Sequence, residues 1–190
     1  GVWHNSISLW RHQLAYNPND RIALNNLATA YRNEPEYREA EEQYRSLVQL
    51  QSEGLNPNDF DPAAKLAANR VGQVADMYLK AIADDPTYPD AYYNLANLYR
   101  DIGQTSDALA LYGKVITLKP NYRGAYYSLG QLYQKAGQPQ NASIAFSRAV
   151  ALNPDNPDVY YDVIKAYNEA LRRDPKNELY QKAREGVFTA

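Results

Sequence analysis

The residue types that usually carry out catalysis are few in this chain of 190 residues. It contains no cysteine, which excludes a thiol nucleophile, a disulfide framework and thiolate metal ligands. The two histidines, His4 and His12, are eight positions apart, so on a helix they share a face but lie too far apart to bind one metal ion easily. Adjacent acids such as Asp84 and Asp85 diverge on a helix and are expected to face solvent. We therefore expect no catalytic residue, no cofactor and no metal ion.

Motifs and composition exclude several further classes of protein. No helix reads HExxH, and no glycine-rich turn follows a predicted strand, so metalloprotease and phosphate-binding motifs are missing. A formal net charge of −2 gives no basic excess for nucleic-acid binding. Hydrophobic residues make up 45% of the chain, yet no apolar run approaches the roughly 18–20 residues of a membrane span. This composition is typical of a globular domain with a sizeable core.

Tyrosine is the residue type in excess, with 18 tyrosines against three phenylalanines. Three tyrosine doublets occur, at 92–93, 126–127 and 160–161. Successive side chains on a helix point about 100° apart, so the two members of a doublet face different surroundings. The first member lies on a stripe with aliphatic residues and is expected to pack between helices. The second member shares its face with a polar residue one turn further along the helix. These polar residues are Asn97, Gln131 and Lys165.

One sequence pattern occurs twice within residues 86–154, and its two copies are offset by about 34 residues. The matched pairs are Tyr92/Tyr126, Leu95/Leu129, Leu98/Leu132, Tyr99/Tyr133, Gly103/Gly137, Ala108/Ala142, Tyr112/Phe146 and Pro120/Pro154. The apolar residues recur at helical spacing, and the two glycines fall where a helix must end with positive φ. The pattern predicts four helices, at 89–102, 105–118, 123–136 and 139–152.

A repeat of about 34 residues with this spelling resembles the tetratricopeptide repeat (TPR), which is a pair of antiparallel helices. The resemblance implies an all-α solenoid, in which helix pairs stack into a right-handed superhelix and end in capping helices. It also implies a concave groove that is lined mainly by the first helix of each pair. The function that this fold implies is the binding of a protein or peptide in that groove.

The rest of the chain extends this frame into a single domain over residues 1–190. Further helices are expected at 3–16, 21–33, 35–51, 62–84, 157–173 and 177–187. The frame assigns 3–18 to a lead-in helix, 19–52 to a repeat, 53–86 to a degenerate repeat with a loop and a long helix, 87–120 and 121–154 to repeats, and 155–190 to capping helices. In the repeat at 19–52, the residues expected to face inward are Ala40, Tyr44, Leu47 and Leu50.

By resemblance to the TPR family, the second tyrosine of each doublet faces the groove together with polar residues of the same helix. The groove residues expected in this way are Tyr93, Asn94, Asn97, Arg100, Tyr127, Gln131, Gln134, Tyr161, Lys165 and Asn168. Aromatic rings beside amides hold an extended peptide through apolar contacts and main-chain hydrogen bonds. Two interpretations stay open: these residues form a ligand groove, or the tyrosines only cover the inner wall.

One specialised TPR group differs from this chain at the groove. TPRs that bind chaperones clamp a terminal carboxylate with lysine and arginine side chains. The matching positions here are Asn25, Tyr93, Tyr127 and Tyr161, so the key lysine is missing. The sequence therefore argues against a carboxylate clamp of that kind.

The N-terminal stretch at 1–28 carries a second, shorter resemblance. Its lead-in helix is similar to the junction in multi-pass membrane proteins where the last span gives way to a C-terminal TPR array. Trp3, Ser6, Leu9, Trp10 and Pro18 carry this similarity. It implies attachment to a membrane-spanning region upstream of Gly1, and a location on the extracytoplasmic face. The alternative is an ordinary N-terminal cap.

The sequence favours a non-catalytic scaffold that binds a protein or peptide, with no nucleic-acid partner and no membrane insertion by this chain. Two alternatives stay open. The chain could be an accessory domain of a membrane-bound glycosyltransferase that positions its acceptor, or a structural module that self-associates through an exposed end of the stack.

Overall fold

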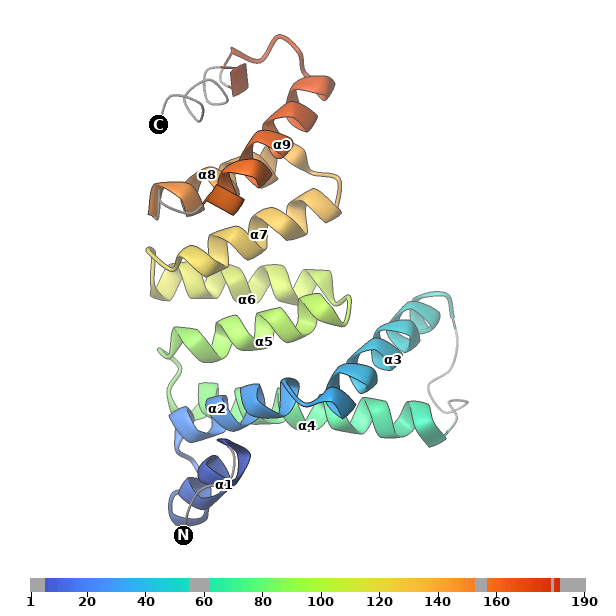
Figure 1. Cartoon of the computed structure of the whole chain (residues 1–190), viewed down its shortest axis with the longest axis vertical. Helices are drawn as coiled ribbons and strands as arrows, with labels where there is room; N and C mark the ends of the chain where they lie inside the picture. Colours follow the sequence, from blue (N-terminus) through green and yellow to red (C-terminus); the bar gives the residue numbers. More distant parts are fainter. Residues whose placement is uncertain (1–5, 55–61, 153–156, 179, 182–190) are drawn as a thin grey trace. The chain divides into compact units, whose positions relative to one another are not determined.

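A computed structural model describes residues 6–54, 62–152, 157–178 and 180–181 (Figure 1). These residues form nine α-helices, and no strand occurs among them, which confirms the all-α prediction. The helices are α1 (Ser6–Tyr16), α2 (Arg21–Arg32), α3 (Pro35–Ser52), α4 (Pro62–Asp84), α5 (Pro89–Asp101), α6 (Thr105–Leu118), α7 (Arg123–Lys135), α8 (Pro139–Leu152) and α9 (Pro157–Arg173).

The helix ends follow local chemistry. The side chain of Asp20 caps α2 by accepting hydrogen bonds from the backbone N–H groups of Ile22 and Ala23. These bonds favour the charged carboxylate and lower the pKa of Asp20, with the bond from Ala23 as the largest cause. Gly103 and Gly137 have φ angles of 87° and 68°, as predicted for the turns inside the two clear repeats.

The chain divides into two compact units, residues 1–114 and 115–190, and each is described by itself. The first unit holds α1 to α5 and the greater part of α6. The second unit holds the last turn of α6 and α7 to α9.

In the first unit, α2 packs along the second half of α4, and α3 packs along the first half of α4 (Figure 1). Ala28 and Tyr78 are fully buried where α2 meets α4, in a cluster that α5 completes with Leu95 and Leu98. The sequence repeat predicts that α2 pairs with α3, whereas in the structure α2 packs mainly against α4. Ala40 and Leu47 are buried as expected, and α3 makes its main contact with α4.

The length of α4 explains this packing. Its 23 residues span about 34 Å at 1.5 Å per residue, so its two halves pack against different helices. Tyr78 holds the repeat position of Tyr112 and Phe146 in the two clear repeats, and all three side chains are fully buried. The second half of α4 therefore covers α2 in the way that a second repeat helix would.

In the second unit, α8 packs between α7 and α9. Phe146 of α8 is fully buried beside Val163 and Ala166 of α9. The ring of Tyr180 packs against this cluster and lies 6.2 Å from the ring of Tyr167. Residues 178, 180 and 181 are helical, and the rest of the helix expected at 177–187 lies outside the described residues.

The lead-in region is described only in part. Trp3 and His4 lie outside the described residues, so the packing of Trp3 stays a prediction. Trp10 is half-buried, no residue of α1 is fully buried, and Leu14 packs near Leu24. No helix in the described ranges is both long and apolar enough to cross a membrane.

Candidate functional site

The expected groove residues belong to both units, so they form two sets. Tyr93, Asn94, Asn97 and Arg100 lie on α5 in the first unit. The second set lies on α7 and α9 in the second unit and comprises Tyr127, Gln131, Gln134, Tyr161, Lys165 and Asn168.

In the first set, the hydroxyl of Tyr112 on α6 joins two of the expected groove residues. It donates to Asn97 Oδ1 at 2.6 Å and accepts from Arg100 Nη1 at 3.5 Å. The ring of Tyr93 lies 5.9 Å from the ring of Tyr112. Tyr112 is fully buried, so these contacts tie the polar face of α5 to the core of its own repeat.

A matching hydroxyl contact occurs between α2 and α4. The hydroxyls of Thr29 and Tyr78 lie 3.1 Å apart, at the positions that Asn97 and Tyr112 hold in the repeat at 87–120. Asn94 Nδ2 donates to Asn25 Oδ1 at 2.9 Å, which joins α5 to a buried amide on α2. The polar face of the first unit therefore satisfies much of its hydrogen-bonding capacity internally.

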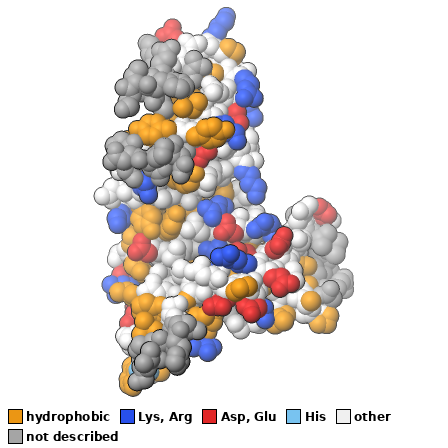
Figure 2. All heavy atoms as spheres, viewed as in Figure 1, with side chains coloured by type: hydrophobic (Ala, Val, Ile, Leu, Met, Phe, Trp, Pro, Cys, Tyr) orange, Lys and Arg blue, Asp and Glu red, His pale blue; other side chains and the backbone are white. Residues whose placement is uncertain are grey.

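Asp101 is the centre of a charged cluster at the end of α5. Its carboxylate accepts from Arg32 Nη2 at 2.7 Å and pairs with Arg100 at 2.8 Å. Arg32 also pairs with Glu41 of α3 at 2.9 Å. Burial alone would lower the pKa of Arg32, but Glu41 and Asp101 outweigh it and raise that pKa. Figure 2 shows acidic and basic side chains mixed over this face of α2, α3 and α4.

The second set begins with Tyr127, which is half-buried. Its hydroxyl donates to the carboxylate of Asp162 on α9 at 2.6 Å. Its ring lies 5.6 Å from the ring of Phe146, with an interplanar angle of 53°. Tyr93 and Tyr112 meet at nearly the same angle, 55°, so the aromatic pair has the same arrangement in both repeats.

The remaining residues of the second set are less engaged than those of the first. Gln131 and Lys165 are exposed, and Tyr161 is 71% exposed. Gln134 is half-buried, and its Nε2 atom is buried with no hydrogen-bond partner among the described residues. Asn168 is half-buried. This set thus presents the exposed ring of Tyr161 and the exposed amide of Gln131.

Sequence spacing adds basic residues to the same two helix faces. On α7, Lys135 follows Gln131 by four positions, and on α9, Arg172 follows Lys165 by seven. Lys135, Lys165 and Arg172 are all exposed. Glu169 shares the face of α9 and is half-buried. The exposed charges on these faces are therefore mainly positive.

The first tyrosine of each clear doublet has a repeated set of contacts. Tyr92 donates to the carbonyl of Pro86, and Tyr126 donates to the carbonyl of Pro120, both at 3.2 Å. A cation lies over each ring: Lys114 is 6.0 Å from the ring of Tyr92, and Arg148 is 5.9 Å from that of Tyr126. These tyrosines pack as expected, but their hydroxyls also fix the entry to α5 and α7.

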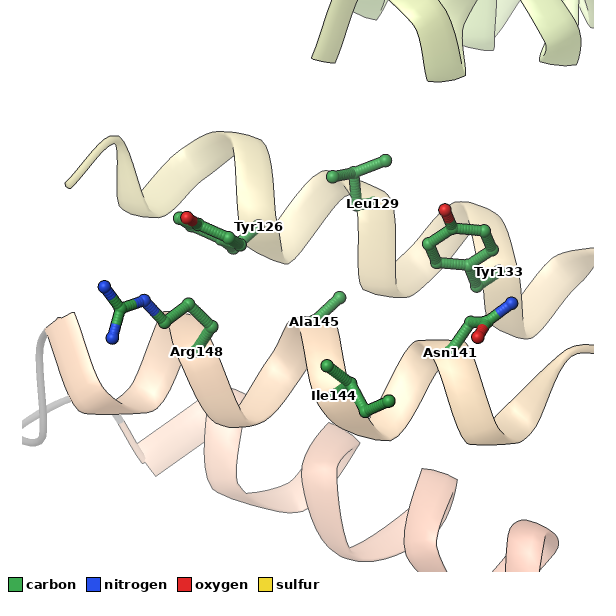
Figure 3. Close-up of a pocket in the computed structure, with 7 residues that line it drawn as sticks. All are labelled: Tyr126, Leu129, Tyr133, Asn141, Ile144, Ala145 and Arg148. Atoms are coloured by element: carbon green, nitrogen blue, oxygen red, sulfur yellow. The ribbon is translucent and has the colours of Figure 1, made fainter. Parts of the chain in front are cut away.

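A surface pocket of about 440 Å³ lies between α7 and α8 (Figure 3). It is lined by Tyr126, Leu129, Tyr133, Asn141, Ile144, Ala145 and Arg148. Ile144 is 63% exposed, and none of the expected groove residues lines this pocket. In the described part of the chain, no three His, Asp or Glu side chains come together in a way that could hold a metal ion.

Sequence reasoning missed the partners of the groove residues. Tyr112, Asp101 and Asp162 form the hydrogen bonds that engage Asn97, Arg100 and Tyr127. Tyr112 and Phe146 hold the same repeat position, and Phe146 lacks the hydroxyl that Tyr112 has. This difference is the one feature of the sequence that indicates a polar role for Tyr112. The contact between Tyr127 and Asp162 joins residues 35 positions apart, and no local pattern predicts it.

Family profiles match most of the central part of the chain. Profiles described as tetratricopeptide repeat match residues 22–61, 77–110 and 124–156, and one described as TPR repeat matches residues 96–137. No curated protein sequence gives a significant match.

Solved structures of similar fold cover nearly the whole chain. A crystal structure of MamA aligns with a TM-score of 0.61 and 21% identity, over 94% of this chain and 85% of that one. YrrB, described as a TPR protein with an unusual peptide-binding site, aligns with a TM-score of 0.55 and 17% identity, over 95% and 82%. The first TPR of Spaghetti (RPAP3), bound to the HSP90 peptide SRMEEVD, aligns with a TM-score of 0.51 and 21% identity, over 56% and 84%.

Proposed function

Because this chain belongs to the tetratricopeptide repeat family and has the all-α solenoid fold, we propose that it binds an extended segment of a partner protein and catalyses no reaction. Two proteins of similar fold are described with a peptide or a peptide-binding site. The expected groove residues of this chain have the chemistry for such a ligand, because they combine tyrosine rings with amides.

One observation supports the second unit as the part that binds. Its groove set carries a tyrosine that is 71% exposed, exposed Gln131 and Lys165, and a buried amide nitrogen without a partner among the described residues. In the first unit, by contrast, Asn94, Asn97 and Arg100 bond to other side chains.

The binding mechanism follows from these groups. The ring of Tyr161 covers an apolar part of the segment, since tyrosine offers a large rigid contact area at a small cost in conformational entropy. Gln131 exchanges hydrogen bonds with the main chain of the segment, as amides do for extended peptides, and Gln134 provides a further donor. The bond from Tyr127 to Asp162 holds α7 and α9 in register beneath the ligand.

The test is a peptide array that carries random 12-residue sequences, probed with the purified full chain. Tyr161→Ala should remove most binding without lowering the melting temperature, because the exposed ring contributes little to the core. Ile144→Ser is the matched control, since Ile144 is also exposed but lies in the pocket between α7 and α8.

Two outcomes would contradict the proposal. One is that no peptide on the array binds the chain. The other is that Ile144→Ser removes binding and Tyr161→Ala does not, which would move the site to the pocket between α7 and α8.

A further inference from the structure

At one buried position beside the expected groove residues, the repeat at 87–120 has a tyrosine and the repeat at 121–154 has a phenylalanine, which lacks the hydroxyl oxygen. Tyr112 and Phe146 are matched residues, both fully buried, and their rings meet Tyr93 and Tyr127 in nearly the same way. A hydroxyl on the ring at 146 would therefore point to the part of α7 that corresponds to Asn97 and Arg100 of α5.

The residues at those corresponding positions are Gln131 and Gln134. Without the hydroxyl, Gln134 Nε2 has no acceptor among the described residues, whereas the guanidinium of Arg100 reaches the oxygen of Tyr112. A buried donor without an acceptor is destabilising relative to a bonded one. Gln134 as a whole is only half-buried, so part of its side chain already reaches the surface. We infer that a change of its side-chain rotamer turns the amide toward a ligand there.

We propose that Phe146 makes the repeat at 121–154 receptive to a ligand, and that the ligand is an acidic protein segment whose side-chain carboxylate accepts the hydrogen bond from Gln134 that a tyrosine hydroxyl at position 146 would otherwise accept. This inference rests on the proposed function, since it names the kind of segment that the groove of the second unit binds. The carboxylate accepts from Gln134, and the neighbouring Gln131 and Lys165 flank it.

The charge distribution supports an acidic ligand. Residues 115–190 contain ten Lys and Arg against seven Asp and Glu, whereas residues 1–114 contain ten against fifteen. Lys135, Lys165 and Arg172 are exposed on the groove faces of α7 and α9. Asp162, an acidic residue next to Tyr161, is engaged by the hydroxyl of Tyr127. An acidic segment is attracted by the positive charge and the hydrogen-bond donors at this surface, whereas a basic segment is repelled by the same charge.

The test uses an array in which each 12-residue peptide is present in three versions, with Asp and Glu, with Asn and Gln, or with Lys at the same positions. All peptides are amidated at the C-terminus, so that any preference for acid comes from side chains. We expect the acidic version to bind about tenfold more tightly than the amide version, with an affinity that falls as salt rises.

The deciding variant is Phe146→Tyr, in which the chain supplies the oxygen itself. The new hydroxyl accepts from Gln134 and competes with the ligand, so affinity for acidic peptides should fall about tenfold while the melting temperature stays equal or rises. Gln134→Leu removes the donor and should weaken acidic peptides to the level of their amide versions. Tyr112→Phe is the control, because it changes the first unit and should leave these affinities unchanged.

The results separate the two proposals. If no peptide binds, the proposed function and this inference both fail. If peptides bind but the acidic and amide versions bind equally, the groove function stands and this inference fails. The same holds if Phe146→Tyr folds and keeps full affinity for acidic peptides. If Phe146→Tyr does not fold, Gln134→Leu decides alone: undiminished preference for acid overturns the inference.

Discussion

Gly130 on α7 is a residue whose lack of a side chain the packing requires. A Cβ atom at this position would lie 2.5 Å from two ring atoms of Phe146, which is fully buried and has no room to move. Gly130→Ala should therefore lower the free energy of unfolding by about 1–2 kcal/mol, even though alanine favours a helix. Thermal or urea unfolding followed by circular dichroism measures the change.

Gly72 on α4 provides the control for that substitution. No atom lies within 4 Å of a Cβ at Gly72, so the only effect expected of alanine there is its higher helix propensity. Gly72→Ala should raise stability by about 0.5–1 kcal/mol. If both alanine variants changed stability in the same direction, close packing on Phe146 would not be the reason for Gly130.

Tyr37 on α3 is 5% exposed, and its hydroxyl has no hydrogen-bond partner among the described residues. Tyr37→Phe removes this unsatisfied group and should raise the free energy of unfolding by about 1 kcal/mol. Tyr78→Phe should lower it by a similar amount, because Tyr78 shares a hydrogen bond with Thr29. Equal effects of the two substitutions in denaturant unfolding would contradict this account.

The same hydroxyl predicts a pH dependence. Burial is the main cause that raises the pKa of Tyr37 above its ordinary value of about 10. The folded state then holds this proton more tightly than the unfolded state, so its contribution to stability is complete below about pH 10 and is lost as pH rises further. The alkaline loss of stability should be smaller in Tyr37→Phe than in the parent chain, in melts between about pH 8 and pH 11.

Residue roles were the hardest part to predict from the sequence. The spacing of the doublets correctly separated Tyr92 and Tyr126, which anchor to proline carbonyls, from Tyr93 and Tyr127. It did not show that Tyr93 and Tyr127 rest on buried rings, because those rings come from the next helix. A rule based on one helix cannot include a partner that lies on another.

Among the elements, α3 is joined to its neighbours by charged side chains as well as by its apolar contacts with α4. Arg32 joins it to α2 and α5 through Glu41 and Asp101, and the side chains of Arg32 and Glu41 are only 16% and 14% exposed. Arg45 of α3 also donates to the backbone carbonyl of Asp101.

Arg32→Leu should therefore loosen α3 before it loosens α2. It leaves the largely buried Glu41 without its cation, which costs about 2–4 kcal/mol locally. Hydrogen exchange with mass spectrometry should show faster exchange in α3 than in the parent chain, with a smaller change in α2. Uniform acceleration across both helices would show that Arg32 supports the whole unit and not the position of α3.

Helix boundaries were predictable because proline, glycine and apolar spacing act locally. The prediction of a helix at 62–84 agrees with α4 at both ends. The packing of α4 was not predictable in the same way, because α3 and the second half of α4 both carry the small and aromatic residues of a second repeat helix. Only the three-dimensional packing shows that α4 lies along α2.

At the scale of the whole molecule, each compact unit has its own buried cluster. Stability in repeat proteins is mainly a sum over neighbouring helices, so damage in one unit should act first in that unit. Gly130→Ala should speed hydrogen exchange in α7, α8 and α9, while α2 and the second half of α4 keep their protection. Equal acceleration in both regions would show that the chain unfolds as a single cooperative body.

The fold class was predictable because a sequence repeat constrains many positions at once. The ligand groove and the membrane attachment inferred from the lead-in helix depend on fewer residues, and they stay predictions. Trp3, which carries much of the resemblance to membrane-attached TPR proteins, lies outside the described residues. The exposure of Tyr161 and the lack of a described partner for Gln134 could not be predicted, because both depend on which neighbours fold against each side chain.

The turn at Gly137 has a consequence for how this chain can be shortened. Arg173, the last residue of α9, donates from Nη1 to the carbonyl of Gly137 at 2.6 Å, so the turn between α7 and α8 is closed by a residue 36 positions later. A fragment that stops after Leu152 keeps every residue of the repeat at 121–154 that the structure describes, yet it loses this contact and the cover that α9 gives to α8. We therefore expect that a fragment meant to preserve this repeat must extend at least through Arg173.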